Sequence, residues 1–339
     1  MASTASPNAG AAGVVAIGAS AGGVQALTCL AANLPPELPY PLLVVLHLPP
    51  AAPSVLAGIL DRNGPLQAVS AADGAALEPG RIHVCVPNHH LLVHDHRVVL
   101  SQGPTENQYR PAINALFRSV AVAFGPRAVG VLMSGVLDDG VLGLATIRAR
   151  SGTTIVQRPD DAAYPAMPQN AINAGVVDHQ SAAADIGALL QRLAHRQIEE
   201  RHMDRDYLTE LENRIAMGRR FAVAVGGETL GPPSGYTCPD CSGSLMTVTD
   251  GNYRCRVGHA WTSEALLAAR DDEVEGAVWV ALRSLKEKAD LARRLAEKLG
   301  SGVTGDRYTR IADESERAML ILGKRLVDTA PESGRNDGG

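Results

Sequence analysis

The sequence is poor in aromatic residues and has no basic excess and no long apolar run. Aromatic residues make up 4% of the chain, too few for the stacking platforms that bind single-stranded nucleic acid. The formal net charge is −5, which gives no attraction to nucleic acid or to an anionic membrane surface. No run approaches the roughly 18 apolar residues of a membrane span. We therefore expect no nucleic-acid partner and no membrane insertion.

Cysteine is also scarce. The five cysteines are an odd number, and three of them crowd between residues 238 and 255, which is not a disulfide framework. Residues 1–12 lack the basic start and apolar core of a secretory signal, and we expect a disordered lead there. Together these features predict a protein of the reducing cytoplasm.

Residues 13–195 alternate short apolar runs with helical patterns. Uninterrupted apolar strands suit a sheet that is covered on both faces, so we predict a doubly wound, mainly parallel α/β domain. The neighbouring segments within 82–101 predict a hairpin. The predicted strands are VVAIGA, PLLVVLHL, IHVCVP, HRVVLS, AVGVLMSG and TTIVQ.

The composition changes near residue 195, where a charged helical pattern begins. A cysteine-rich segment follows, and then a helix that Thr262 or Ser263 caps and Gly300 ends. That helix has a near-heptad apolar pattern and is expected to pair antiparallel with a second helix over about 306–327. The predicted parts are a disordered lead (1–12), the α/β domain (13–195), a helical linker (196–235), a zinc-ribbon-like module (236–262), a helical hairpin (263–328) and a disordered tail (329–339).

The stretch VVAIGASAGGVQAL (14–27) ends an apolar run in a glycine-rich turn and then begins a helical pattern. It fits G-x-S-x-G, a strand-to-helix turn that presents a nucleophilic serine, here Ser20. It also fits an altered G-x-G-x-x-G turn that would hold a dinucleotide. The dinucleotide interpretation requires an acid at the end of the next strand. That strand ends in His47 instead, which favours the nucleophilic serine.

Three predicted strands end in the residue types of a Ser-His-Asp hydrolase. The carboxyl ends of neighbouring parallel strands open onto one crevice, where Ser20 and His47 are expected to meet. A serine hydroxyl needs a base to take its proton, and the base needs an acid to orient it. AVGVLMSG is followed by Asp138 and Asp139, either of which supplies that acid. The order Ser-His-Asp differs from that of α/β-hydrolases, but this constellation recurs on unrelated folds.

Five blocks resemble, in order and spacing, the catalytic domain of chemotaxis protein-glutamate methylesterases. They are GASAGG, VVLHLPP, YRPAINALFRSVA, VGVLMSGVLDDGVLGL and AYPAMPQNAINAG. The resemblance covers about residues 12–195. It implies a hydrolase that removes methyl groups from γ-glutamyl methyl esters on chemoreceptor helices without a cofactor. Deamidation of receptor glutamines by the same acyl-transfer route is left open. Because about a dozen residues precede the first strand, we expect no receiver domain.

The resemblance assigns a role to each of the three residues. Ser20 is the nucleophile, His47 is the general base and Asp139 is the orienting acid, because the family's acid directly precedes the glycine that is Gly140 here. It also places the backbone N–H that binds the oxyanion on Val136 and puts Arg110 near the substrate.

The chain departs from the family pattern at two positions. Ala21 replaces the threonine that usually follows the serine, and the G-M-G before the acid is here Gly135-Val136-Leu137. These departures keep a non-catalytic adaptor open as an alternative function, one that binds receptor or signalling partners through the C-terminal parts. A dinucleotide-binding oxidoreductase is a further alternative, which the missing acid after the second strand disfavours.

Two clusters suggest metal ligands. Cys238-x2-Cys241 and Cys255-x3-His259, with thirteen residues between the two pairs, have the ligand types and spacing of a structural zinc ribbon. Reduced cysteines without a metal are the alternative. In LLVHDH, strand alternation would place His94 and His96 on one face, but we favour a polar hairpin edge there.

Overall fold

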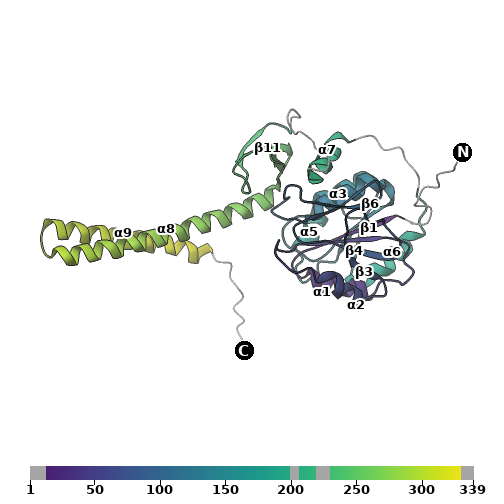
Figure 1. Ribbon diagram of the computed structural model, residues 1–339, viewed down its shortest axis with the longest axis horizontal. Coiled ribbons are helices and arrows are strands. Elements are labelled where there is room, and N and C mark those ends of the chain that lie inside the picture. Colours follow the sequence, from purple (N-terminus) through teal and green to yellow (C-terminus); the bar gives the residue numbers. More distant parts are fainter. Residues whose placement is uncertain (1–12, 199–205, 219–229, 330–339) are drawn as a thin grey trace. The chain divides into compact units, whose positions relative to one another are not determined.

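The computed structural model describes residues 13–198, 206–218 and 230–329. The expected lead, the expected tail and parts of the expected linker lie outside these residues. The chain forms two compact units, 1–266 and 267–339, each described here by itself (Figure 1). Among the described helices, none is long and apolar enough to cross a membrane.

The first unit is built on a parallel sheet of seven strands, which confirms the predicted fold class. The strand order is β3-β4-β2-β1-β7-β8-β9, and every neighbouring pair is parallel. Since β2 and β7 flank β1, the carboxyl ends of these three strands open where the strand order reverses. The strands are β1 (Val14–Ala19), β2 (Leu42–Leu46), β3 (Gln67–Ser70), β4 (Arg81–Val84), β7 (Ala128–Leu132), β8 (Thr153–Gln157) and β9 (His179–Ser181).

Apolar cores cover both faces of this sheet. Val15 and Ile17 of β1 face one core and Val14 and Ala16 face the other, which explains the uninterrupted apolar runs in the sequence. In Figure 1, α1 and α2 lie below the sheet and α3 lies above it. The first core contains α1 (Gly23–Ala32), α2 (Leu56–Asn63) and α6 (Ile186–Ala194). The second contains α3 (Ile113–Phe124), α4 (Val141–Ala149) and α5 (Ala166–Asn173).

The predicted hairpin within 82–101 is wrong in its extent. β4 belongs to the parallel sheet, and only β5 (His90–His94) and β6 (Arg97–Ser101) pair as an antiparallel hairpin. His96 lies in the hairpin turn with a φ of 56°, so it does not share a strand face with His94. The sequence pattern missed β3 and β9, because these short, partly exposed edge strands contain no apolar run.

The segment expected to be a helical linker contains α7 (Tyr207–Ala216), which packs on the domain. The carboxylate of Asp206 caps its start by accepting a hydrogen bond from the Thr209 N–H at 3.2 Å. Ala216 and Met217 are buried in one cluster with side chains of α3, β5 and β6. This helix is therefore part of the first unit rather than a spacer.

Residues 233–262 form a four-stranded antiparallel sheet, which we call the Cys/His module. Its core includes Leu245 and Trp261, which are 0% and 1% exposed. The hydroxyl of Thr262 accepts a hydrogen bond from the Ala265 N–H at 3.2 Å, which confirms Thr262 as the cap of the helix that follows. The strands, in sheet order, are β10 (Pro233–Thr237), β11 (Ser244–Thr249), β12 (Asn252–Cys255) and β13 (Ala260–Thr262).

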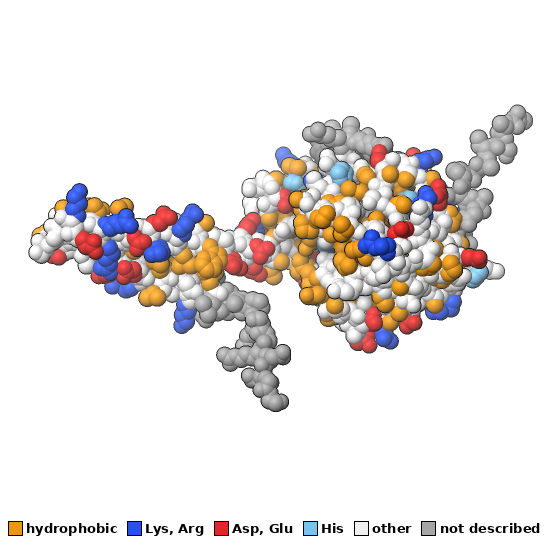
Figure 2. Space-filling model, turned by 60° about the horizontal axis from the view of Figure 1, so that its bottom comes forward, with side chains coloured by type: hydrophobic (Ala, Val, Ile, Leu, Met, Phe, Trp, Pro, Cys, Tyr) orange, Lys and Arg blue, Asp and Glu red, His pale blue; other side chains and the backbone are white. Residues whose placement is uncertain are grey.

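The second unit is the predicted helical hairpin. It holds most of α8 (Ser263–Leu299) and all of α9 (Val303–Thr329), and Gly300 ends α8 with a φ of 68°. Small side chains, including Ala292 and Ala312, are buried in it. Charged side chains of both signs lie along its surface in Figure 2, and Arg293 of α8 pairs with Asp313 of α9 at 2.6 Å.

Candidate active site

Ser20, His47 and Asp139 meet at the carboxyl edge of the parallel sheet. Ser20 follows β1, His47 follows β2, and Asp139 lies in the loop between β7 and α4. The Ser20 Oγ lies 3.1 Å from His47 Nδ1, and His47 Nε2 lies 2.8 Å from Asp139 Oδ2. The imidazole and carboxylate side chains are only 5% and 3% exposed. The three groups thus form a continuous hydrogen-bonded chain whose imidazole and carboxylate are shielded from water, while Ser20 is partly exposed.

The carboxylate of Asp139 is also held by the start of a helix. Its Oδ2 accepts the N–H of Ile113 at 2.7 Å, and its Oδ1 accepts the N–H of Asn114 at 3.2 Å. These amides begin α3, where unpaired N–H groups and the helix dipole favour a negative charge. Asp139 does not cap α4, because Gly140 occupies the N-cap position of that helix and no side chain caps it.

The His47 ring is fixed on its face as well as at its two nitrogens. Tyr109 stacks on it, with ring centroids 3.6 Å apart and planes 5° from parallel. Burial, and then the charge of Asp139, raise the pKa of Tyr109, which keeps the phenol neutral. Sequence reasoning missed Tyr109, although it lies inside the quoted block YRPAINALFRSVA. The resemblance of that block to the family pointed to this part of the chain, but nothing in the sequence indicated a contact between Tyr109 and His47.

The loop before Asp139 has a backbone conformation that glycine would adopt more easily. Leu137, at the position of the family's second glycine, has a φ of 58°. Within the described part of the chain, the Val136 N–H donates no hydrogen bond and is free for an oxyanion. The Ser20 N–H is not free, because it donates to the Ser134 carbonyl at 2.9 Å.

Arg110 is held by groups of the protein itself. Its Nε and Nη2 donate to Asn88 Oδ1 at 3.0 and 2.6 Å, and its Nη1 donates to the Gly103 carbonyl at 2.8 Å. Arg110 also lines a hollow of about 670 Å³ with Asn88, His89, Leu100, Ser101, Gln102 and Met217. It lies next to Tyr109 in the chain, so its backbone is near the imidazole while its guanidinium braces the flanking loops.

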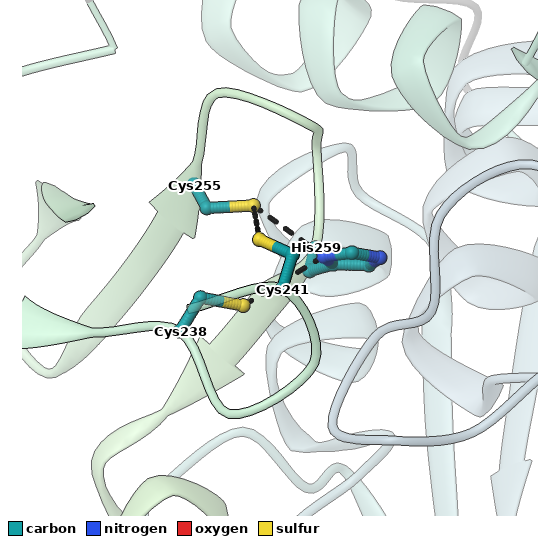
Figure 3. A group of neighbouring side chains, drawn as sticks. All are labelled: Cys238, Cys241, Cys255 and His259. Atoms are coloured by element: carbon teal, nitrogen blue, oxygen red, sulfur yellow. Dashed lines mark hydrogen bonds between the residues drawn. The ribbon is translucent and has the colours of Figure 1, made fainter. Parts of the chain in front are cut away.

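The four predicted metal ligands converge in the Cys/His module (Figure 3). The ligand atoms of Cys238, Cys241, Cys255 and His259 all lie within 4.8 Å of one another. The Sγ atoms of Cys241 and Cys255 are 3.6 Å apart, and the His259 Nδ1 lies 3.7 and 3.5 Å from the Sγ atoms of Cys238 and Cys255. The sulfur separation is far from the roughly 2.05 Å of a disulfide. It matches the edges of about 3.6 to 3.8 Å that tetrahedral zinc with sulfur and nitrogen ligands would impose.

The fold and the three side chains define a class of protein: a doubly wound α/β domain with a serine, a histidine and an aspartate arranged as in serine hydrolases. The profile of the CheB methylesterase family matches residues 15–190, more than half of the chain. The chain belongs to this family, as the motif resemblance predicted. The match ends before α7, the Cys/His module and the helical hairpin.

Named relatives agree with this assignment. A protein-glutamate methylesterase/protein-glutamine glutaminase 3 of Anaeromyxobacter dehalogenans is 42% identical over 167 residues, which cover 49% of each chain. A protein-glutamate methylesterase/protein-glutamine glutaminase 1 of Caulobacter vibrioides is 35% identical over 53% of this chain and 54% of the relative. The chain thus spans about half the length of the curated relatives it matches.

The fold has a counterpart among solved structures. The crystal structure of the Thermotoga maritima CheB methylesterase catalytic domain is similar with a TM-score of 0.51 and 29% sequence identity. The likeness covers 53% of this chain and 98% of that domain. It accounts for the parallel sheet and leaves the C-terminal parts of this chain without a counterpart there.

Proposed function

We propose that this chain is a protein-glutamate methylesterase that hydrolyses γ-glutamyl methyl esters on chemoreceptor helices. The observation that carries the proposal is the chain of short contacts from Ser20 through His47 to Asp139 at the open edge of the sheet. Family membership and the names of the relatives support the substrate class. The proposed setting is the cytoplasm, where the receptor helices and reduced thiols would be found.

The geometry supports covalent acyl transfer through a serine ester. With its proton on Nε2, His47 donates to Asp139 and offers its Nδ1 lone pair to the Ser20 hydroxyl. Ser20 Oγ then attacks the ester carbonyl, and the oxyanion is placed to accept the free N–H of Val136. His47 returns the proton to the departing methoxide, which leaves as methanol. A water molecule, deprotonated by His47, next hydrolyses the glutamyl-serine ester and restores the free enzyme.

The same steps would hydrolyse a receptor glutamine, with ammonia leaving in place of methanol. The names of the relatives include a glutaminase activity, which supports this second substrate. An amide is the harder substrate, because its nitrogen must be protonated before it leaves.

The decisive measurement is methanol release from a methylated chemoreceptor signalling domain. We expect Ser20→Ala to lower the rate by about 10⁴-fold or more, because it removes the nucleophile of the triad. Ser151→Ala, at an exposed serine between α4 and β8 on the opposite edge of the sheet, is the matched control and should keep the full rate. A serine-reactive phosphonate should label the parent chain at Ser20. Equal background release from all three proteins, without labelling of Ser20, would favour the non-catalytic adaptor.

We also propose that Cys238, Cys241, Cys255 and His259 hold a structural zinc ion. The support is their mutual distances, which fit one tetrahedral ion, and the mixture of three thiols with one imidazole. Such an ion would cross-link β12 and the turns around it, and it would supply no open position for substrate. Metal analysis of the purified chain should find about one zinc per molecule.

A further inference from the structure

The Cys/His module contacts the loop that carries Asp139. The Thr262 hydroxyl, at the end of β13, donates to Asp138 Oδ1 at 2.8 Å. Asp138 directly precedes Asp139, so this hydrogen bond acts one residue from the group that orients the imidazole. Thr262 is 4% exposed, so water competes little for the bond.

A second contact reaches the same loop one residue earlier. The Asn170 Nδ2 donates to the Leu137 carbonyl at 3.1 Å and to Glu264 Oε2 at 3.0 Å. Glu264 lies two residues after the end of the Cys/His module, in the first turn of α8. Leu137 has the left-handed conformation described above, which costs on the order of 1–3 kcal/mol and persists only where the surroundings enforce it.

A third contact leads to the face of the imidazole. Residues 105–107 run beside β13: the Asn107 N–H donates to the Ala260 carbonyl at 2.8 Å, and the Ala260 N–H donates to the Thr105 carbonyl at 3.2 Å. A tight turn then joins Glu106 to Tyr109 through reciprocal backbone hydrogen bonds of 3.2 and 2.9 Å. Tyr109 is the ring that stacks on His47. The hydrogen bonds along β13 thus hold the segment that places the Tyr109 ring against His47, the general base.

Two of the proposed metal ligands are neighbours in the chain of residues that make these contacts. His259 directly precedes Ala260 of β13, and Cys255 directly follows Arg254. Arg254 is 1% exposed and pairs with Glu106 at 3.4 Å, from the segment that runs beside β13. Anything that holds Cys255 and His259 in place therefore also holds β13 and residues 105–107.

We propose that the Cys/His module is a positioning element for the esterase, in which metal binding fixes Thr262 and residues 105–107 and thereby orders the Asp139 loop and the Tyr109 ring around His47. This inference rests on the proposed esterase function. A module of about 30 residues buries too little apolar surface to be stable alone, so its metal would supply much of its folding free energy. Loss of the metal frees β13 and loosens two of the groups that orient the imidazole.

The first test does not depend on esterase activity. Hydrogen–deuterium exchange is compared between the full chain loaded with zinc and the same chain stripped by a chelator. We expect peptides covering 134–142 and 105–114 to exchange about 10-fold faster after stripping, since a loss of about 1.4 kcal/mol of local stability gives that factor. Peptides covering 153–157 of β8 should not change. Unchanged exchange over 134–142, in a module that has itself lost protection, would overturn the inference.

Point variants test the hydrogen bond between Thr262 and Asp138 separately from metal binding. Thr262→Val removes the hydroxyl that reaches Asp138, Thr262→Ser keeps it, and Thr247→Val in β11 is a matched control within the module. Asp138→Ala removes the acceptor but leaves Thr262 as the cap of α8. We expect Thr262→Val and Asp138→Ala to accelerate exchange over 134–142 with zinc still bound, and the double variant to add little to either. Thr262→Ser and Thr247→Val should exchange like the parent chain.

Kinetics on the methylated receptor then report catalysis. Misplacement of a catalytic group by about 1 Å costs about 100-fold. We therefore expect zinc removal and Thr262→Val to lower kcat by about 10- to 100-fold with little change in KM. Parent-like kcat and exchange in both cases would refute the positioning role. If the zinc-loaded parent chain releases no methanol, the proposed esterase fails, and the exchange measurements still decide whether the module orders the loop.

Discussion

Replacing Glu106 by an uncharged residue should markedly lower the stability of the fold. It is 2% exposed and lies between two arginines of different parts of the first unit. Its carboxylate accepts from Arg118 of α3 at 2.5 and 3.2 Å, and from Arg254 of β12 at 3.4 Å. Burial by itself would raise the pKa of Glu106, but the two guanidinium groups lower it to about 2. Glu212 also pairs with Arg254, at 2.9 Å, but its side chain is 24% exposed, so Glu106→Gln removes the fully buried charge that both arginines share.

The magnitude follows from the pKa. A carboxyl whose pKa falls from 4.5 to about 2 on folding contributes about 3 kcal/mol to the free energy of unfolding near neutral pH. Removing one member of a buried ion pair costs about 3–5 kcal/mol by comparison with other proteins. We therefore expect Glu106→Gln to lower the free energy of unfolding by about 3 kcal/mol at pH 7.

Urea unfolding followed by tryptophan fluorescence measures this loss. Trp261 is 1% exposed in the Cys/His module, whereas Trp279 is 58% exposed, so a Trp279→Phe background isolates the buried probe. Because the pKa of Glu106 is depressed, its contribution is present above about pH 5 and is lost as the pH falls toward 2. The difference between parent and variant should therefore shrink below pH 4.

The control is Glu78→Gln. Glu78 pairs with Arg81 at 2.7 Å, but its side chain is 55% exposed, so its loss should change the free energy of unfolding by less than about 0.5 kcal/mol. A loss below about 1 kcal/mol for Glu106→Gln at pH 7 would refute this account of the network. So would a difference between parent and variant that stays constant down to pH 3.

Three further outcomes are expected. Burial, together with the carboxylates of Glu264 and Asp139, raises the pKa of Asp138 to about 6, so its ionisation opposes folding increasingly as the pH rises from about 4 to 6. The free energy of unfolding of Asp138→Asn relative to the parent chain should therefore rise by about 2 kcal/mol between pH 4 and pH 6 and then stay level; a difference independent of pH would contradict this. Cys255→Ser should abolish zinc binding in metal analysis and lower the urea midpoint reported by Trp261, and undiminished zinc content would count against the site. Gly276→Ala, in α8 where an added Cβ meets nothing, should stabilise the helical hairpin by about 0.5–1 kcal/mol in thermal unfolding followed by circular dichroism, and a loss would contradict that.

Much of the fold could be read from local pattern. The uninterrupted apolar runs indicated buried parallel strands, because a sheet covered on both faces leaves no strand face for polar residues. The edge strands β3 and β9 escaped notice for the opposite reason, since QAVS and HQS are short and partly exposed. The runs IHVCVP and HRVVLS are close in sequence and were taken for one hairpin, but β4 joins the parallel sheet and β6 pairs with β5 instead.

Part of the candidate site could likewise be predicted from local sequence, and part could not. Ser20, His47 and Asp139 were predictable because parallel strands bring their carboxyl ends to one edge, whatever the separation of the residues in the chain. The four Cys/His ligands were predictable because spacing in short turns limits where they lie. Tyr109 against His47 and Glu106 between its arginines carried no such local signature.

The sequence alone determined what is periodic or local: the doubly wound sheet, the residues at the strand ends, the Cys/His spacing and the helical hairpin. Only the tertiary structure decided that Asp139 lies on the start of α3, that α7 packs on the domain, and that Thr262 reaches the Asp139 loop. Each of these contacts joins residues that are far apart in the chain. Such pairings depend on how separately formed elements pack, which local periodicity and motif spacing do not reveal.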